Sequence, residues 1–90
     1  MADNAPWRIA ITSRAERELT TLPVRDQARV RAGIDDLGVF PTRGDLQKLR
    51  GLEDEWRLRI GRWRIRLRPD RDNHVIVVLR VLPRGRAYRP

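Results

Sequence analysis

Residues 56–68 read WRLRIGRWRIRLR, and large apolar side chains alternate with arginine on both sides of the dipeptide Gly61-Arg62. Strict alternation is typical of a half-buried β-strand. A two-residue connection that begins with glycine is typical of a type II′ hairpin turn. The stretch therefore predicts two antiparallel strands in which Ile60 faces Trp63 and each pair further from the turn keeps this register.

The register places four arginines on one side of the predicted hairpin, with Arg59 opposite Arg64 and Arg57 opposite Arg66. We call these four residues the arginine face. Like charges directly opposite each other destabilise a sheet, whereas guanidinium groups pair bidentately with phosphate and stack on bases. We therefore expect a polyanion to supply the counter-charge. The alternative is a solvated outer face that protects the sheet from edge-to-edge association.

The first half of the chain predicts a strand and two helices. Residues 7–11 alternate as a short strand, and Ser13 and Glu16 have the spacing of a capping box, with Ser13 as the cap. Pro23 ends this first helix and can open the next one. The buried side of the second helix is marked by three apolar residues at helical spacing, Val30, Ile34 and Leu37.

The remaining segments complete an α+β domain. Residues 42–54 predict a polar surface connection, and residues 75–82, which are apolar except for Arg80, predict a central strand covered on both faces. The order β-α-α-β-β-β predicts an antiparallel pair of helices on one face of a small, mostly antiparallel sheet. We expect one domain over residues 7–88 and a flexible start over residues 1–6.

Composition limits the classes of protein to which this chain can belong. A chain of 90 residues is too short for a second core. The absence of cysteine excludes disulfides and thiolate metal sites, and we expect neither a metal nor a cofactor. No apolar run approaches the roughly 20 residues that span a bilayer, and the first residues do not resemble a signal peptide. We therefore expect a cytoplasmic location and no membrane partner.

The charge is distributed unevenly along the chain. Residues 1–55 carry nine basic and ten acidic side chains, whereas residues 56–90 carry eleven arginines against two aspartates, within a total net charge of +8. A GC-rich genome explains why 19 of the 20 basic residues are arginine, but not why only one part of the chain is basic. A concentrated positive field attracts polyanions.

Other candidate residues favour structural interpretations. His74, the single histidine, lies beside a predicted turn and is expected to be exposed rather than catalytic. The carboxylates of Asp35-Asp36 and of residues 53–55 are adjacent in sequence and do not converge on one ion. Trp56 and Trp63 alternate with the arginines, so we expect them in the core rather than as base-stacking platforms.

The order of elements and three sequence runs resemble the RelE/ParE toxin superfamily over residues 7–88. These runs are KLRG at residues 48–51, WRLRIGRWRI at residues 56–65 and VLPRGRAY at residues 81–88. RelE-like members are metal-independent, ribosome-dependent endoribonucleases that cut mRNA through the substrate's own 2′-hydroxyl. The resemblance therefore implies this activity, a cognate antitoxin, and mRNA and the ribosome as partners.

The resemblance also implies roles for individual residues. Arg57 and Arg59 would be the basic pair on the first hairpin strand, and Arg64 would clamp the phosphate. Arg84 and Tyr88 would complete the catalytic site from the C-terminal end. Further RNA-binding residues would be Lys48, Arg50, Arg66 and Arg86.

Two departures from the family pattern bear on proton transfer. Some RelE members have lysine where Arg57 and Arg59 stand, and arginine does not lose its proton in proteins. Many members have histidine where this chain has Pro83. Proton transfer would then depend on Tyr88 or on the ribosome, and catalysis would be slow.

Three functions are compatible with these sequence features. The first is an mRNA-cleaving toxin whose antitoxin lies over the arginine face and the helices. The second is a non-enzymatic DNA gyrase inhibitor of the ParE kind, which the absence of lysine at positions 57 and 59 favours. The third is a nucleic-acid-binding module, whose affinity would fall steeply with salt.

Overall fold

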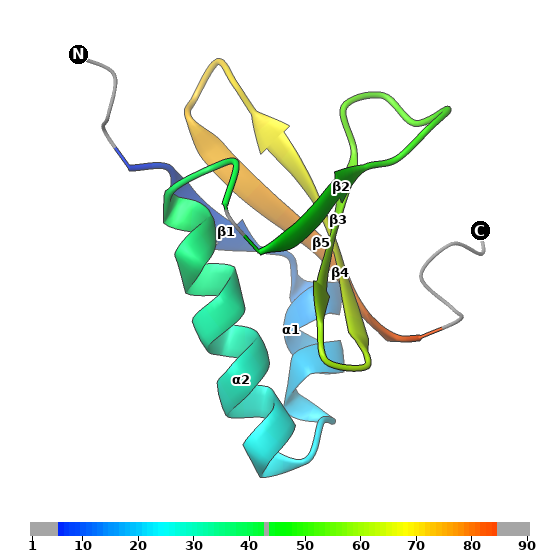
Figure 1. The fold of residues 1–90 in the computed structure, drawn as a ribbon. Helices are drawn as coiled ribbons and strands as arrows, with labels where there is room; N and C mark the ends of the chain where they lie inside the picture. Colours follow the sequence, from blue (N-terminus) through cyan, green and yellow to red (C-terminus); the bar gives the residue numbers. More distant parts are fainter. Residues whose placement is uncertain (1–5, 43, 85–90) are drawn as a thin grey trace.

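The computed structural model describes residues 6–42 and 44–84, which form two α-helices and a five-stranded sheet (Figure 1). In chain order the elements are β1 (Arg8–Ile11), α1 (Ser13–Thr20), α2 (Val24–Asp35), the 3₁₀ turn η1 (Asp36–Gly38), β2 (Asp45–Lys48), β3 (Trp56–Ile60), β4 (Trp63–Asp70) and β5 (Val75–Pro83). Of the predicted flexible start, residues 1–5 lie outside the described residues.

The strand order in the sheet is β1-β5-β4-β3-β2, with β1 parallel to β5 and all other pairs antiparallel. The predicted α+β architecture is confirmed. The sheet has one strand more than predicted, because β2 forms within residues 42–54 and pairs with β3. The first strand, whose neighbour the sequence did not indicate, lies beside β5.

The predicted register of the β3–β4 hairpin is confirmed, with Ile60 opposite Trp63 and Arg59 opposite Arg64. Gly61 has a φ of 59°, and Arg62 is not among the residues with positive φ. A type II′ turn needs a positive φ at its first central residue only. The glycine therefore sets the turn, and the turn sets which arginines face one another.

The core lies between the helices and one face of the sheet, with α1 over β5 and α2 over β3 (Figure 1). Trp56 and Trp63 pack against this core, as predicted, and their indole N–H groups donate to Asp54 and Asp26. The predicted buried side of α2 is also confirmed. The buried apolar residues are Ala15, Leu19, Leu22, Val30, Ile34, Leu37, Leu58, Ile65, Leu67, Ile76, Val78, Val81 and Leu82.

The cap of α1 differs from the prediction by one residue. Thr12, not Ser13, is the N-cap, and its hydroxyl accepts a hydrogen bond from the Ala15 N–H at 3.1 Å. Ser13 is the first helical residue, so the predicted capping box is wrong. The helices that the structure describes are too short and too polar to cross a membrane.

Strand β5 extends beyond the end of β1. Side chains of α1 and of its N-cap form hydrogen bonds with the backbone of β5 where β1 no longer pairs with it. The Glu18 carboxylate accepts from the Val81 N–H at 2.8 Å and from Arg80, while the Thr12 hydroxyl donates to the Leu79 carbonyl at 3.2 Å. The prediction that both faces of this strand are covered is wrong, because the helices cover only one face of the sheet. The side chain of Leu79, away from the helices, is only half-buried.

Gly33 of α2 allows the helix to approach β3 closely. A Cβ atom at this position would lie 2.3 Å from the Cδ1 of Ile60. We expect Gly33→Ala to lower the free energy of unfolding by about 1 kcal/mol, because overpacking of about 2 kcal/mol exceeds the gain of about 1 kcal/mol in helix propensity. Urea denaturation followed by tryptophan fluorescence measures the change.

Ile60→Val is the matched partner in a double-mutant cycle, because it removes the atom that Gly33→Ala would strike. We expect the double variant to be more stable than the sum of the two single changes predicts. Additive effects would show that the close approach of α2 and β3 does not depend on Gly33.

Candidate functional site

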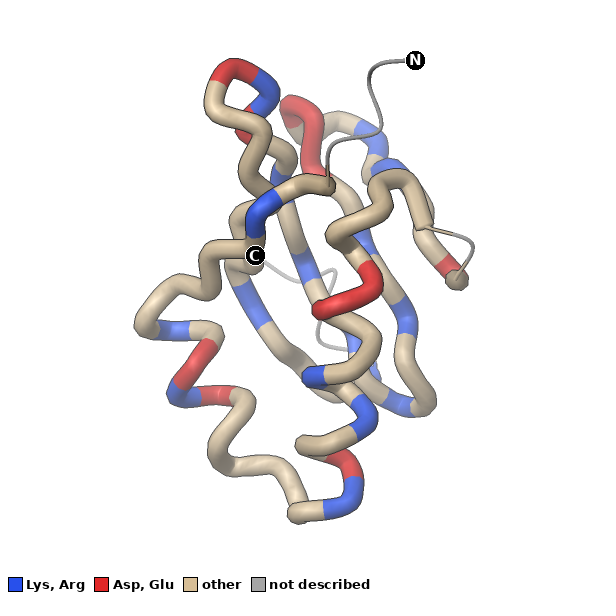
Figure 2. Tube along the Cα trace, turned by 90° about the vertical axis from the view of Figure 1, so that its left-hand side faces the viewer, with Lys and Arg blue, Asp and Glu red and all other residues tan. Residues whose placement is uncertain are grey.

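The arginine face lies on the side of the sheet away from the helices. Its side chains alternate with the core residues of β3 and β4, and the observed register puts Arg59 opposite Arg64 and Arg57 opposite Arg66. Figure 2 shows basic positions recurring along these strands. The prediction that four guanidinium groups share one face is confirmed.

Strand β2 supplies one carboxylate and one amide oxygen to two of these arginines. The Asp45 carboxylate lies 2.9 Å from Nε of Arg59 and 3.6 Å from Nη2 of Arg57. The side-chain oxygen of Gln47 accepts from Nη2 of Arg57 at 2.6 Å. The expectation that a polyanion must supply the counter-charge is therefore wrong in part for this pair, because one carboxylate of the chain is shared by the two guanidinium groups.

A third arginine of this face is paired within the chain. Arg66 forms an ion pair with Glu55, and their side chains are only 16% and 11% exposed. Glu55 directly precedes β3, where the alternation of the strand places it on the same side as Arg57. Three of the four opposed arginines therefore have a carboxylate partner, which reduces the like-charge repulsion that the sequence indicated.

Arg64 differs from the other three. It is only 6% exposed, and no carboxylate of the described residues lies within 4.0 Å of it. Its Nη1 makes long contacts of 3.5 and 3.4 Å with the carbonyls of Gly61 and Trp63. Its Nε has no hydrogen-bond partner among the described residues, which does not by itself distinguish it from the other buried arginines of this face. A buried cation without an anion is costly. Arg64 is therefore the position on this face best prepared to receive an external anion.

Arg84 lies beside the β3–β4 turn. Its backbone N–H donates to the Arg62 carbonyl at 2.8 Å, and its side chain is exposed. Position 82 is opposite Arg64 in β5, so the chain passes Arg64 just before it reaches Arg84. The predicted site residues Tyr88 and Arg86 lie outside the described residues.

Two predicted RNA-binding residues are not part of the arginine face. Lys48 is opposite Trp56 at the end of β2, and Trp56 packs against the core, so Lys48 is on the helix-facing side of the sheet. Arg50 is exposed in the turn after β2. The basic run at residues 48–51 therefore lies apart from the four opposed arginines.

His74 is half-buried rather than exposed as predicted, because its ring stacks on Trp7 with centroids 4.0 Å apart. In the described part of the chain, no three His, Cys, Asp or Glu side chains gather closely enough to hold a metal ion.

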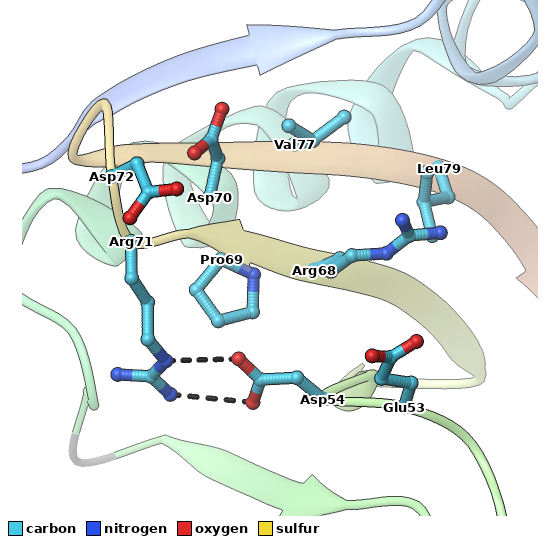
Figure 3. A pocket seen from close by; sticks show the side chains of 9 residues that line it. All are labelled: Glu53, Asp54, Arg68, Pro69, Asp70, Arg71, Asp72, Val77 and Leu79. Carbon is cyan, nitrogen blue, oxygen red and sulfur yellow. Dashed lines mark hydrogen bonds and ion pairs between the residues drawn. The ribbon is translucent and has the colours of Figure 1, made fainter.

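A hollow of about 490 Å³ lies at the other end of the same sheet face, beside the β4–β5 turn (Figure 3). Carboxylates and two arginines surround it, and apolar side chains from β4 and β5 form part of its wall. The sequence did not indicate it, because it forms where the segment before β3 meets the β4–β5 turn. Its lining residues are Glu53, Asp54, Arg68, Pro69, Asp70, Arg71, Asp72, Val77 and Leu79.

The pKa of one carboxyl group beside this hollow, that of Asp54, is lowered by its hydrogen-bond partners. Hydrogen bonds from Arg71 and then from Trp56 hold the pKa of Asp54 below its ordinary value of 3.8. A lowered carboxyl pKa stabilises the fold above the unfolded-state pKa, and this stabilisation is lost as pH falls through the folded-state pKa. We expect NMR titration to show a midpoint below 3.8 that rises in Arg71→Ala. Arg68→Ala should leave the midpoint unchanged, and an equal rise there would contradict the assignment.

Three comparisons relate this chain to known proteins. A family model described as the ParE toxin of the type II toxin–antitoxin system parDE matches residues 9–88. No curated protein sequence matches the chain. Several solved structures resemble it closely.

The RelBE2 toxin–antitoxin complex from Mycobacterium tuberculosis contains a chain of 33% identity and TM-score 0.77, with 88% of this chain and 99% of that chain covered. The RelE–RelB complex from Pyrococcus horikoshii contains one of 30% identity and TM-score 0.77, with 91% and 99% covered. The isolated RelE toxin of E. coli, at 19% identity and TM-score 0.76 over 91% and 88%, shares the fold. The chain therefore belongs to the RelE/ParE superfamily of toxins of type II toxin–antitoxin systems.

Proposed function

We propose that this toxin is a metal-independent endoribonuclease that cleaves mRNA on the ribosome in the cytoplasm, and that a cognate antitoxin inhibits it. The observation that carries the proposal is Arg64, a buried guanidinium with no carboxylate partner among the described residues. A phosphate group of RNA would supply the missing anion, because planar guanidinium binds phosphate oxygens bidentately.

The chemistry would use the substrate as its own nucleophile. The 2′-oxygen attacks the adjacent phosphorus and the bond to the 5′-oxygen breaks, which leaves a 2′,3′-cyclic phosphate and a 5′-hydroxyl. Negative charge accumulates on the phosphoryl oxygens in the transition state. Preorganised cations stabilise such charge, and Arg64 together with Arg84 would supply them.

The other arginines would have unequal roles. Arg59 is 52% exposed and directly opposite Arg64, so it can reach the same phosphate if it exchanges its Asp45 contact for the substrate. Arg57 and Arg66 are mostly buried and carry ion pairs that offset their charge, so they would act chiefly in holding the face together rather than in binding phosphate. None of them can act as a general base, so proton transfer is assigned to Tyr88 or to the ribosome.

Two observations support an antitoxin as the partner. The relatives of 33% and 30% identity were solved as complexes of toxin and antitoxin. The surface around Arg64 also carries exposed cations, Arg59 and Arg84, that acidic side chains can bind as well as phosphate can. An antitoxin that covers these groups would exclude mRNA.

The test is to induce the toxin briefly without antitoxin and to map mRNA 5′ ends by primer extension. We expect growth arrest and new 5′-hydroxyl ends within translated codons, and no such ends in a transcript whose start codon has been removed. Arrest with intact transcripts would refute the ribonuclease proposal.

One observation favours a second function, inhibition of DNA gyrase without catalysis. Arg57 and Arg59, which stand where some ribonucleases of the family have lysine, are held by Gln47 and Asp45. Such groups are less available to a substrate. Accumulation of gyrase cleavage complexes after induction would support this function, and their absence would exclude it.

A further inference from the structure

The sheet face that carries the arginine face has opposite charge at its two ends. At the β4–β5 end, four carboxylates surround the hollow, Glu53, Asp54, Asp70 and Asp72. Figure 2 shows acidic positions gathered in the loops at this end of the molecule and basic positions along the strands. The face is therefore bipolar rather than uniformly basic.

Two of these carboxylates have no side-chain partner among residues 6–42 and 44–84. Asp54 is bound by Arg71 at 2.8 Å and Asp70 by Asn73 at 2.9 Å, as Figure 3 shows for the first pair. Glu53 and Asp72 are exposed and form no ion pair with the described residues. They leave a negative rim that repels RNA phosphates and attracts cations.

The hollow offers apolar surface inside this rim. Val77 and Leu79 of β5 are half-buried, and with Pro69 they line it (Figure 3). The hollow, of about 490 Å³, is open to solvent and large enough to receive one side chain of a bound segment. An aliphatic side chain would fit the lining. A phosphodiester would lose hydration there and would meet two arginines, Arg68 and Arg71, of which Arg71 is already bound to Asp54.

The arginine face and the hollow lie on the same side of the sheet and are connected by β4. Arg64, Arg66 and Arg68 alternate along β4 and so share one side of the sheet. Four residues of extended strand separate Arg64 from Arg68, a distance of about 13 Å. A short polypeptide segment spans this distance with about four residues if it is extended.

We propose that this face binds a single protein segment of matching polarity. The carboxylates of this segment lie over Arg59 and Arg64. About four residues further along the segment, an aliphatic side chain enters the hollow. Lysine or arginine residues on either side of this aliphatic residue lie beside Glu53 and Asp72. RNA, which is uniformly anionic, matches only the arginine end. The inference rests on the proposed antitoxin and specifies the segment that it presents to this face, but it does not depend on ribonuclease activity.

The test uses synthetic peptides with blocked ends and fluorescence anisotropy against the purified full chain. The bipolar peptide carries two glutamates, two alanine spacers and a leucine between two lysines, so that the leucine is four residues from the nearer glutamate. A second peptide has the reverse order, because the face does not determine the direction in which the segment runs. Acidic and leucine–lysine halves are measured separately, as is a twelve-nucleotide oligouridine. We expect one bipolar peptide to bind at least tenfold more tightly than either half.

Charge reversal at the rim separates a protein partner from RNA. Glu53→Arg combined with Asp72→Arg should reduce bipolar-peptide affinity to that of the acidic half and should leave oligouridine affinity equal or higher. The matched control is Asp35→Arg, an exposed acid on α2, combined with Asp36→Arg, which should not weaken the peptide. The proposal is overturned if neither bipolar peptide exceeds its halves, or if rim reversal weakens oligouridine as much as peptide.

Discussion

Arg64→Ala is expected to reduce ribosome-dependent mRNA cleavage by about 10²–10³-fold, the loss typical when one preorganised transition-state donor is removed. The physical reason is the position of Arg64, which is buried, fixed and without a carboxylate among the described residues. Single-turnover cleavage of mRNA on purified ribosomes measures the change. Arg64→Lys should recover only part of the rate, because an ammonium group lacks the planar fork.

Stability measurements distinguish a functional role of Arg64 from a structural one. Arg64 is buried with an unsatisfied Nε, so Arg64→Met should leave the free energy of unfolding unchanged or raise it while cleavage falls. Arg68→Ala removes an exposed arginine from the same strand and face and should reduce cleavage less than fivefold. Equal losses in Arg68→Ala and Arg64→Ala would indicate a nonspecific clamp.

Glu55→Ala is expected to lower the free energy of unfolding by about 3 kcal/mol, because it leaves Arg66 as a buried charge without its partner. Chemical denaturation followed by tryptophan fluorescence measures the loss. The double variant Glu55→Leu/Arg66→Met should recover most of it, since apolar replacement of both partners of a buried pair is often neutral.

The pair between Glu16 and Arg31 serves as a matched comparison. Its N–O distance is 2.7 Å, but the side chains are 44% and 42% exposed. Glu16→Ala should cost less than about 1 kcal/mol, because solvent screens exposed ion pairs. Similar losses for Glu16→Ala and Glu55→Ala would show that burial does not determine the strength of the Glu55–Arg66 pair.

The β3–β4 hairpin was predictable from local sequence alone. A period of two, interrupted by Gly61, specifies both the faces of the strands and their register, and the structure follows it. The side of α2 that meets the core was predictable for the same reason, since Val30 and Ile34 repeat at helical spacing. Local periodicity therefore accounted for the position of Arg64 and of the residue opposite it.

The counter-charges were not predictable in the same way. Asp45 lies in a four-residue strand with a single apolar residue, Leu46, which is too short a pattern to reveal a strand. Asp45 meets Arg59 only because β2 pairs with β3, a non-local contact. The position of Glu55 was predictable from the sequence, because the alternation of β3 extended by one residue places it on the same side as Arg57. The hollow depends on two loops that meet in space, and no periodicity describes loops.

The carboxylate of Glu18 has a consequence for self-association. The strands that end the sheet, β1 and β2, are only four residues long, whereas β5 is nine residues long and continues past β1. Without Thr12 and Glu18, this overhang would offer free amide and carbonyl groups as a template for strands of other molecules, the usual route to fibrillar aggregates. A side chain of a helix thus protects the longest strand of the sheet from polymerisation.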